Sequence, residues 1–195
     1  MQSQTFIFFG QVGSGKGTQV KFLTDFLKTK NGLETVYAGT GEGFRKLIES
    51  GSYTASLIKE YVHNGVLVPD FITDAVFSNI LISFLAPEKN LITDGYPRTV
   101  AQSEVFEKMM KFFKREKGNI IYIELSQEEA MKRLKLRGRH DDTDEGITKR
   151  FDEYVNNVVP AMNYFKGKEG YEIYTINGEQ SKEDVSKEII KVLNF

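Results

Sequence analysis

The first candidate for chemistry is a glycine-rich segment with one lysine, GQVGSGKGT at residues 10–18. Its first seven residues have the spacing of a phosphate-binding loop, Gly-x4-Gly-Lys. Glycines let backbone amides approach phosphate oxygens, because no side chain obstructs them. A helix that begins near Gly15 would direct its partly positive end at the same phosphates, and Lys16 would add a mobile positive charge. The segment therefore predicts nucleotide binding rather than a flexible turn.

The residue after the lysine departs from the strict pattern, which ends in Lys-Ser/Thr. Gly17 follows the lysine, and the threonine is displaced by one position. A GTPase-like switch would have the strict pattern and a guanine-reading Asn-Lys-x-Asp, and no such tetrapeptide occurs in the sequence. We expect ATP to be held by the following loop residues: Gly13, Ser14, Gly15, Lys16, Gly17 and Thr18.

Five short segments rich in β-branched and aromatic residues are predicted to be strands, and they cover residues 5–9, 35–37, 90–93, 119–125 and 171–176. Helical spacing follows the loop at Val20, Leu23 and Leu27, and a later helix is expected to place Phe71, Ala75, Ile82 and Leu85 on one face. Strands that alternate with helices predict a parallel sheet covered on both faces. No strand is expected between about 41 and 84, which predicts a helical insertion, and residues 138–146 predict an exposed loop.

Length and composition narrow the class of protein. A chain of 195 residues with 27% charged residues predicts one globular domain, and its net charge of −1 provides no basic field for nucleic acid. The basic run at 108–117 is interpreted as a solvated helix face with an apolar stripe. Cysteine is absent, and neither a signal peptide nor a membrane span is predicted. We therefore expect a cytoplasmic protein that binds no nucleic acid and no membrane.

A resemblance to a known family follows from several motifs together. The loop resembles that of the nucleoside monophosphate kinases, in which Gly-Lys-Gly-Thr replaces the usual ending. Further matches occur in family order along nearly the whole chain, and Asp-Gly-Tyr-Pro-Arg after a strand is the most specific of them. The set is similar to the adenylate kinases. The matching segments are Thr40-Gly41-Glu42…Arg45, Gly65-Val66-Leu67-Val68-Pro69, Asp94-Gly95-Tyr96-Pro97-Arg98…Gln102 and Arg133…Arg137-Gly138-Arg139…Asp141-Asp142…Arg150.

The resemblance implies the fold and its subdivisions. It implies an α/β class, a three-layer P-loop NTPase fold with a five-stranded parallel sheet, as one domain over residues 1–195. The core would comprise residues 1–30, 71–133 and 147–195. A helical insertion near 31–70 would bind the nucleoside monophosphate (NMP), and a short lid would cover 134–146.

The implied reaction is reversible phosphoryl transfer from MgATP to AMP, giving two ADP and serving adenine nucleotide homeostasis. Two anionic substrates must be held in line, so preorganised cations are needed, and arginine binds phosphate bidentately. The resemblance assigns Arg45 and Arg98 to the acceptor phosphate and Arg137 to the ATP side, against the adenine. It assigns Arg133, Arg139 and Arg150 to the transferring phosphoryl group and its neighbours. The implied catalytic set is Lys16, Arg98, Arg133, Arg139 and Arg150.

Asp94 follows an expected strand and would lie near the glycine loop. We expect it to hold Mg²⁺ through water, since Mg²⁺ prefers oxygen ligands and keeps several waters. A turn-forming Asp before Gly is the alternative. No general base is required, because the acceptor is already a phosphate oxyanion. His63 and His140 are therefore interpreted as solvated bystanders.

The choice of acceptor depends on residues Thr40 and Gln102. Pyrimidine-specific relatives tend to have Ala and Asn at these positions, so AMP is favoured and a UMP/CMP-type kinase is the alternative. The amide of Gln102 could pair with adenine, and Val68 would offer a carbonyl or an apolar wall. The residues expected to bind AMP are Thr40, Arg45, Val68, Gly95, Arg98 and Gln102.

Two departures from the family pattern affect these expectations. Glu42 replaces the usual Asp, and Gly43 weakens a helix start by about 1 kcal/mol relative to Ala, which would loosen the acceptor subdomain. The lid is short, so whether Arg137 and Arg139 both reach phosphate is open. Asp141 and Asp142 are expected to pair with lid arginines, or else to cap the helix that contains Ile147.

Other classes of function were weighed against this one. A non-catalytic nucleotide sensor on the same fold would keep the loop and lose the transferring arginines, which the sequence retains. The expected partners are ATP, AMP and ADP, and the resemblance favours a monomer.

Overall fold

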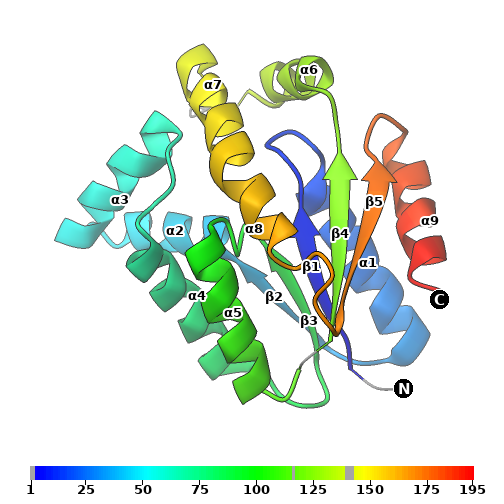
Figure 1. Cartoon of the computed structure of the whole chain (residues 1–195). Helices are drawn as coiled ribbons and strands as arrows, with labels where there is room; N and C mark the ends of the chain where they lie inside the picture. The colour runs from blue at the N-terminus through cyan, green and yellow to red at the C-terminus, as the bar shows by residue number, and fades with distance from the viewer. Residues whose placement is uncertain (1–2, 116, 139–142) are drawn as a thin grey trace.

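The computed structural model describes residues 3–115, 117–138 and 143–195. Its strands form one five-stranded, all-parallel sheet in the order β2-β3-β1-β4-β5 (Figure 1). Each predicted strand is confirmed, with ends that differ by at most two residues. The strands are β1 (Thr5–Phe9), β2 (Thr35–Gly39), β3 (Asn90–Asp94), β4 (Gly118–Glu124) and β5 (Tyr171–Asn177).

Helices separate the strands, as the alternation of patterns predicted. The stretch in which no strand was expected contains α3, α4 and all of α2 except its first residue. A π-helical turn, η1 (Tyr154–Val158), joins α7 to α8. The helices are α1 (Lys16–Asn31), α2 (Thr40–Glu49), α3 (Tyr53–Asn64), α4 (Asp70–Phe84), α5 (Val100–Phe112), α6 (Gln127–Arg137), α7 (Asp144–Glu153), α8 (Val159–Asn163) and α9 (Lys182–Val192).

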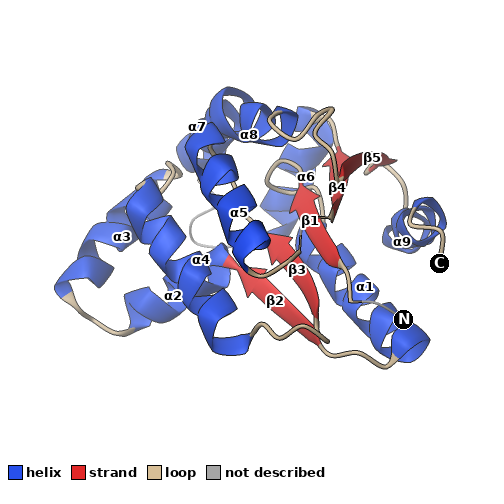
Figure 2. Ribbon diagram, turned by 60° about the horizontal axis from the view of Figure 1, so that its bottom comes forward, coloured by secondary structure: helices blue, strands red, loops and turns tan. Residues whose placement is uncertain are grey.

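The sheet has a hydrophobic core on each face, because side chains alternate along β1. Ile7 and Phe9 face a core shared with α4, α5 and α8, whereas Phe6 and Phe8 face a core shared with α1 and α9. Figure 2 shows the helices on the two sides of the sheet. Each such fully buried side chain contributes roughly 1.5–3 kcal/mol. The three layers are thus helix, sheet and helix.

One of the predicted helix faces was wrong. In α4 the buried residues are Thr73, Phe77 and Leu81, while Phe71 and Ile82 are 71% and 75% exposed. This helix is apolar on most sides, so spacing alone does not single out its core face. In the basic run at 108–117, Arg115 turns inward and its guanidinium donates to Thr5 Oγ1 and to the carbonyls of Gln4 and Lys89.

Helices α2, α3 and α4 share a small core of their own, formed by Phe44, Ile58 and Val68. Gly43 contributes to this packing, because a Cβ there would collide with Val76 of α4. Gly43 was expected to loosen the acceptor subdomain, but its lack of a side chain also lets α2 and α4 approach each other closely. The end of α3 also reaches α7, where Gly65 lies directly against the backbone carbonyl of Gly146.

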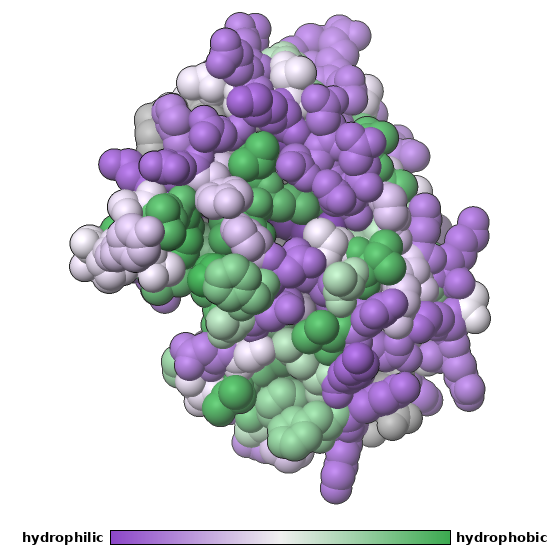
Figure 3. Space-filling model, turned by 60° about the vertical axis from the view of Figure 1, so that its left-hand side comes forward, coloured by the Kyte–Doolittle hydropathy of each residue, from purple (hydrophilic) through white to green (hydrophobic). Residues whose placement is uncertain are grey.

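The surface formed largely by these helices is mixed in character. Exposed hydrophobic side chains include Tyr53 on α3 and Phe84 on α4. Figure 3 shows apolar side chains interspersed with hydrophilic ones in the middle and lower part of this face, and a mainly hydrophilic upper part. Single exposed apolar residues are ordinary on protein surfaces. Within the described ranges, no helix is both long and apolar enough to cross a membrane.

Candidate active site at the carboxyl ends of the strands

The glycine-rich loop connects the carboxyl end of β1 to the first residue of α1, as predicted. A Cβ at Gly10 would lie 2.7 Å from the carbonyl oxygen of Ile123, and its φ of 146° disfavours other residues. The loop is closed by a hydrogen bond from Ser14 N to Gln11 O at 3.2 Å. Helix α1 begins at Lys16, so its free amides face the loop. This geometry suits a phosphate group.

Lys16 is held by the loop itself. Its Nζ donates to the carbonyl oxygens of Gly10 at 2.7 Å and Gln11 at 2.9 Å. Burial lowers the pKa of Lys16 to about 8, an effect opposed by the charge of Asp94 and reinforced by those of Arg98 and Arg137. The three sequence-predicted residues that act on this pKa therefore lie near the lysine.

This lowered pKa predicts that ATP binding takes up a proton at alkaline pH. Above pH 8 the free lysine is increasingly neutral, and a bound phosphate would raise its pKa and restore the charge. Between about pH 8 and 9.5 affinity should then fall by up to tenfold per unit. Calorimetry in buffers of different ionisation enthalpy measures the uptake. Lys16→Arg, charged throughout, should abolish it, and uptake that persists in that variant would exclude Lys16 as its source.

Asp94 is the last residue of β3 and pairs in register with Phe8 of β1 and Gly39 of β2. The hydroxyl of Tyr37 donates to its Oδ2 at 3.4 Å. The ring of Tyr37 lies over Gly39, where a Cβ would collide with it. Burial, and then the charge of Asp94, raise the pKa of Tyr37. Sequence reasoning missed this tyrosine, although an aromatic residue two positions before a glycine on one strand face was a usable signal.

Residues of the expected acceptor site converge on one carbonyl group. Thr40 Oγ1 and Arg98 Nε each donate to the oxygen of Gly95 at 2.8 Å. Burial lowers the pKa of Arg98, the charge of Asp94 opposes this, and the charge of Arg150 adds to it. Arg150 on α7 is therefore near Arg98. Burial raises the pKa of Tyr37 and the charge of Arg45 on α2 opposes this rise, so Arg45 is also nearby.

Two further acceptor residues already have protein partners. Gln102 is 1% exposed; its Nε2 donates to Asp70 Oδ1 at 2.8 Å and its Oε1 accepts from the backbone N–H of Arg98 at 2.8 Å. The carbonyl of Val68 accepts from Thr73 Oγ1 at 3.1 Å. Sequence reasoning did not identify Asp70, which is 32 residues from Gln102 in the chain.

A cavity of about 340 Å³ lies on the other side of the glycine loop. It is lined by the loop, by Arg133 of α6 and by the connection from β5 to α9. The guanidinium of Arg133 is paired with Glu129 at 2.8 Å. Sequence reasoning did not assign the connection from β5 to α9 to the site, although it follows a predicted strand and so had to reach this edge of the sheet. From this connection, Gly178, Gln180 and Lys182 line the cavity.

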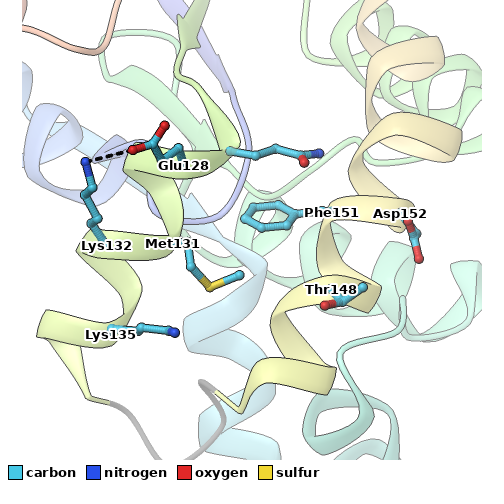
Figure 4. Close-up of a pocket in the computed structure, with 8 residues that line it drawn as sticks. Glu128, Met131, Lys132, Lys135, Thr148, Phe151 and Asp152 are labelled. Atoms are coloured by element: carbon cyan, nitrogen blue, oxygen red, sulfur yellow. Dashed lines mark ion pairs between the residues drawn. The ribbon is translucent and has the colours of Figure 1, made fainter.

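A second cavity, of about 540 Å³, opens between α6 and α7. Figure 4 shows Met131 of α6 and Phe151 of α7 pointing into it, with Lys132 paired to Glu128 at 3.1 Å on one side. None of its lining residues was predicted for the site or lines the first cavity. It is therefore left outside the candidate active site.

Part of the predicted lid lies outside the described residues, namely Arg139, His140, Asp141 and Asp142. Helix α6 ends at Arg137 and α7 begins at Asp144. Thr143 occupies the N-cap position of α7, and its Oγ1 accepts from Gly146 N at 3.1 Å. The capping role considered for the two aspartates is thus filled by the neighbouring threonine.

The fit of a metal rests on Asp94. In the part of the chain that the structure describes, no three acidic or histidine side chains are grouped as a metal site. A single carboxylate at the phosphate loop suits Mg²⁺, which keeps several waters and binds nucleotide phosphates through few protein ligands. The residues present therefore fit a magnesium ion that is carried largely by the nucleotide.

The fold and the site together define a class of protein. A strand, a glycine loop with its lysine and a helix N-terminus meet at the carboxyl edge of a parallel sheet, with an aspartate on the adjacent strand. This arrangement is that of the P-loop proteins, which bind nucleoside phosphates.

Comparison with known proteins identifies the family. The model of the family described as adenylate kinase matches residues 8–170. The adenylate kinase of Rickettsia rickettsii (strain Sheila Smith) is 30% identical over 221 aligned residues, which cover 97% of this chain and 98% of that protein. Those of Cyanothece sp. and Bacteroides fragilis are 31% and 32% identical over 192 residues, covering 96% of this chain and 94% and 97% of theirs. The chain belongs to the adenylate kinase family.

The alignments with these relatives differ in length. The Rickettsia alignment, at 221 positions, is longer than the chain itself, whereas the other two, at 192, are not. The Rickettsia protein therefore contains insertions relative to this chain.

Proposed function

We propose that this protein catalyses reversible phosphoryl transfer from MgATP to AMP, giving two ADP. The observation that carries the proposal is the convergence of Lys16, Asp94, Arg98, Arg137 and Arg150, whose charges act on one another at the carboxyl edge of the sheet. Four cations beside two acidic residues, Asp94 and Glu153, have little use in a structural core. They suit a site that must hold two polyphosphates and stabilise the charge of the transferring group.

Each residue then has a role in positioning the substrates. The loop amides and Lys16 would bind the donor phosphates, and Arg98 and Arg45 would bind the acceptor phosphate. Arg150, which is near Arg98, would stand beside the transferring group. The acceptor phosphate is already an oxyanion, so no side chain has to remove a proton.

For Arg133 and Arg137 we propose the reverse of the roles implied by the family resemblance. Arg133 lines the cavity beside Gln180, away from the lysine, which supports a position against the donor nucleoside. The charge of Arg137 acts on Lys16, which supports contact with the phosphates. Arg139 stays a predicted phosphate ligand, and Asp141 and Asp142 stay predicted partners of lid arginines.

Mg²⁺ would be held near Asp94 through water, and it would neutralise phosphate charge when bound. Thr40 and Gly95 would form the floor of the acceptor site below the AMP phosphate. The subdivisions at about 31–70 and 134–146, the monomeric state and the cytoplasmic location also stay predictions.

A coupled assay of MgATP with AMP, CMP, UMP and GMP tests the proposal. We expect AMP to be used with a kcat/KM at least about tenfold above the others, since Thr40 and Gln102 match the AMP-specific pattern. Equal rates with CMP or UMP would indicate the pyrimidine-type kinase instead. Binding of ATP and AMP without turnover would indicate a nucleotide-sensing protein.

A further inference from the structure

The amide of Gln102 lies between two groups of opposite hydrogen-bonding character. Its Nε2 donates to Asp70 Oδ1 and its Oε1 accepts from Arg98 N, both at 2.8 Å. An ionised carboxylate only accepts and a backbone N–H only donates. The amide therefore has one favourable orientation, because a flipped amide would oppose oxygen to carboxylate and N–H to N–H.

The carboxylate of Asp70 is itself held in place. Its Oδ2 accepts from Thr99 Oγ1 at 2.9 Å, and the same hydroxyl accepts from the backbone N–H of Gln102 at 3.1 Å. Tyr96 adds a contact from its hydroxyl to the carbonyl of Gln102 at 3.4 Å. The first residue of α4 is thus connected to the first turn of α5 by a closed ring of hydrogen bonds.

This ring leaves part of the amide unused. An amide nitrogen has two hydrogens and an amide oxygen has two lone pairs. Among the described residues, one partner of Nε2 and one of Oε1 are found. One donor and one acceptor remain, in an order that the ring fixes. Since Gln102 is 1% exposed in this conformation, a base would reach them only after the neighbouring acceptor helices move.

We propose that Asp70 is a positioning residue that fixes the orientation of the Gln102 amide and thereby sets the preference for a 6-amino over a 6-keto purine monophosphate. The inference rests on the proposed function. The amide oxygen accepts from the exocyclic amine of adenine, and the nitrogen donates to the ring nitrogen N1. Hypoxanthine has the inverse pattern, a carbonyl oxygen and a ring N–H, and would require the flipped amide.

The purine pair AMP and IMP isolates this effect, because the two bases have nearly the same size and stacking surface. Cytosine presents the same amine and ring nitrogen as adenine. The oriented Gln102 amide therefore does not distinguish AMP from CMP. Discrimination between those two must come from the dimensions of the site. The contact with Asp70 therefore affects only the discrimination between bases with an amino group and bases with a keto group.

The test compares kcat/KM for AMP and IMP in the wild type and in Asp70→Asn. The asparagine keeps the shape of the side chain but can face either end of the amide. Loss of a charged hydrogen bond should lower the AMP/IMP ratio at least about tenfold. Asp74→Asn is the matched control, one turn further along α4; its carboxylate accepts from Tyr96 instead, and the ratio should stay within about twofold. Asp70→Ser replaces Asp70→Asn if the latter is unfolded at the assay temperature.

A second pair of variants shows whether Asp70 acts through Gln102. In a Gln102→Ala background, adding Asp70→Asn should leave the AMP/IMP ratio unchanged. An unchanged ratio in Asp70→Asn alone, or an equal fall in both backgrounds, would overturn the inference, as would a wild type that uses AMP and IMP equally. A wild type with no transfer to either acceptor would instead contradict the proposed function.

Discussion

Replacing Arg98 by alanine should lower kcat about 1,000-fold while the protein stays folded. The guanidinium is placed by its bond to the Gly95 carbonyl and lies near the charges of Asp94 and Arg150. It would therefore hold the acceptor phosphate close to the transferring group. The fold should tolerate its loss, because the backbone N–H of residue 98 keeps its bond to Gln102.

Arg98→Lys is the matched control for this prediction. It keeps the charge and loses the planar fork that binds phosphate through two parallel hydrogen bonds. Its kcat should lie between those of the wild type and the alanine variant, about 10- to 100-fold below the former. Stopped-flow or coupled assays measure the rates, and thermal unfolding checks the fold. Full activity in Arg98→Ala would remove the proposed reaction from this site.

The second large effect is expected at Gly10, where alanine should destabilise the protein by about 3 kcal/mol. The new Cβ would meet the Ile123 carbonyl at 2.7 Å and Ser14 Oγ at 2.8 Å, and φ is 146°. Overpacking costs about 1–3 kcal/mol and the unfavourable φ about 1–2 kcal/mol more. The displaced loop should also lose ATP affinity, which equilibrium binding would measure beside urea unfolding.

Two neighbouring glycines separate the causes of this effect. Gly15 has a φ of 88° with no atom near its Cβ position, so alanine there should cost about 1 kcal/mol. At Gly17, in the first turn of α1, a Cβ also meets nothing, and alanine should be neutral or stabilise by up to about 1 kcal/mol. If Gly10→Ala proved as stable as Gly15→Ala, the contact of the new Cβ with the Ile123 carbonyl of β4 would not affect stability.

Much of the fold could be predicted because its signals are local. Residues 5–9 are all β-branched or aromatic, and the last four are apolar, as expected of a strand buried on both faces. The turn from β1 into α1 needs glycines at fixed positions, so it can be recognised from the sequence. The face of α4 could not be predicted, since apolar residues on most sides of a helix leave the choice to its neighbours.

The site was predictable where one motif carries its residues, and less so where tertiary contacts do. Lys16, Asp94 and Arg98 belong to short motifs next to strands, and the structure brings them together. Asp70 has no motif, and its bond to Gln102 depends on how α4 packs beside α5. The connection after β5 was likewise invisible as a motif, because it contributes to the cavity by position rather than by residue type.

The contact of Gly65 with the Gly146 carbonyl has a consequence for motion. It joins the end of α3, in the segment proposed to bind the acceptor, to the first turn of α7. Arg150 lies in the last turn of the same helix. The two segments contact each other through backbone atoms, with no side chain between them, so a movement of one must carry the other with it or break the contact. Entry of one substrate would then be coupled to the placement of a cation that serves the other.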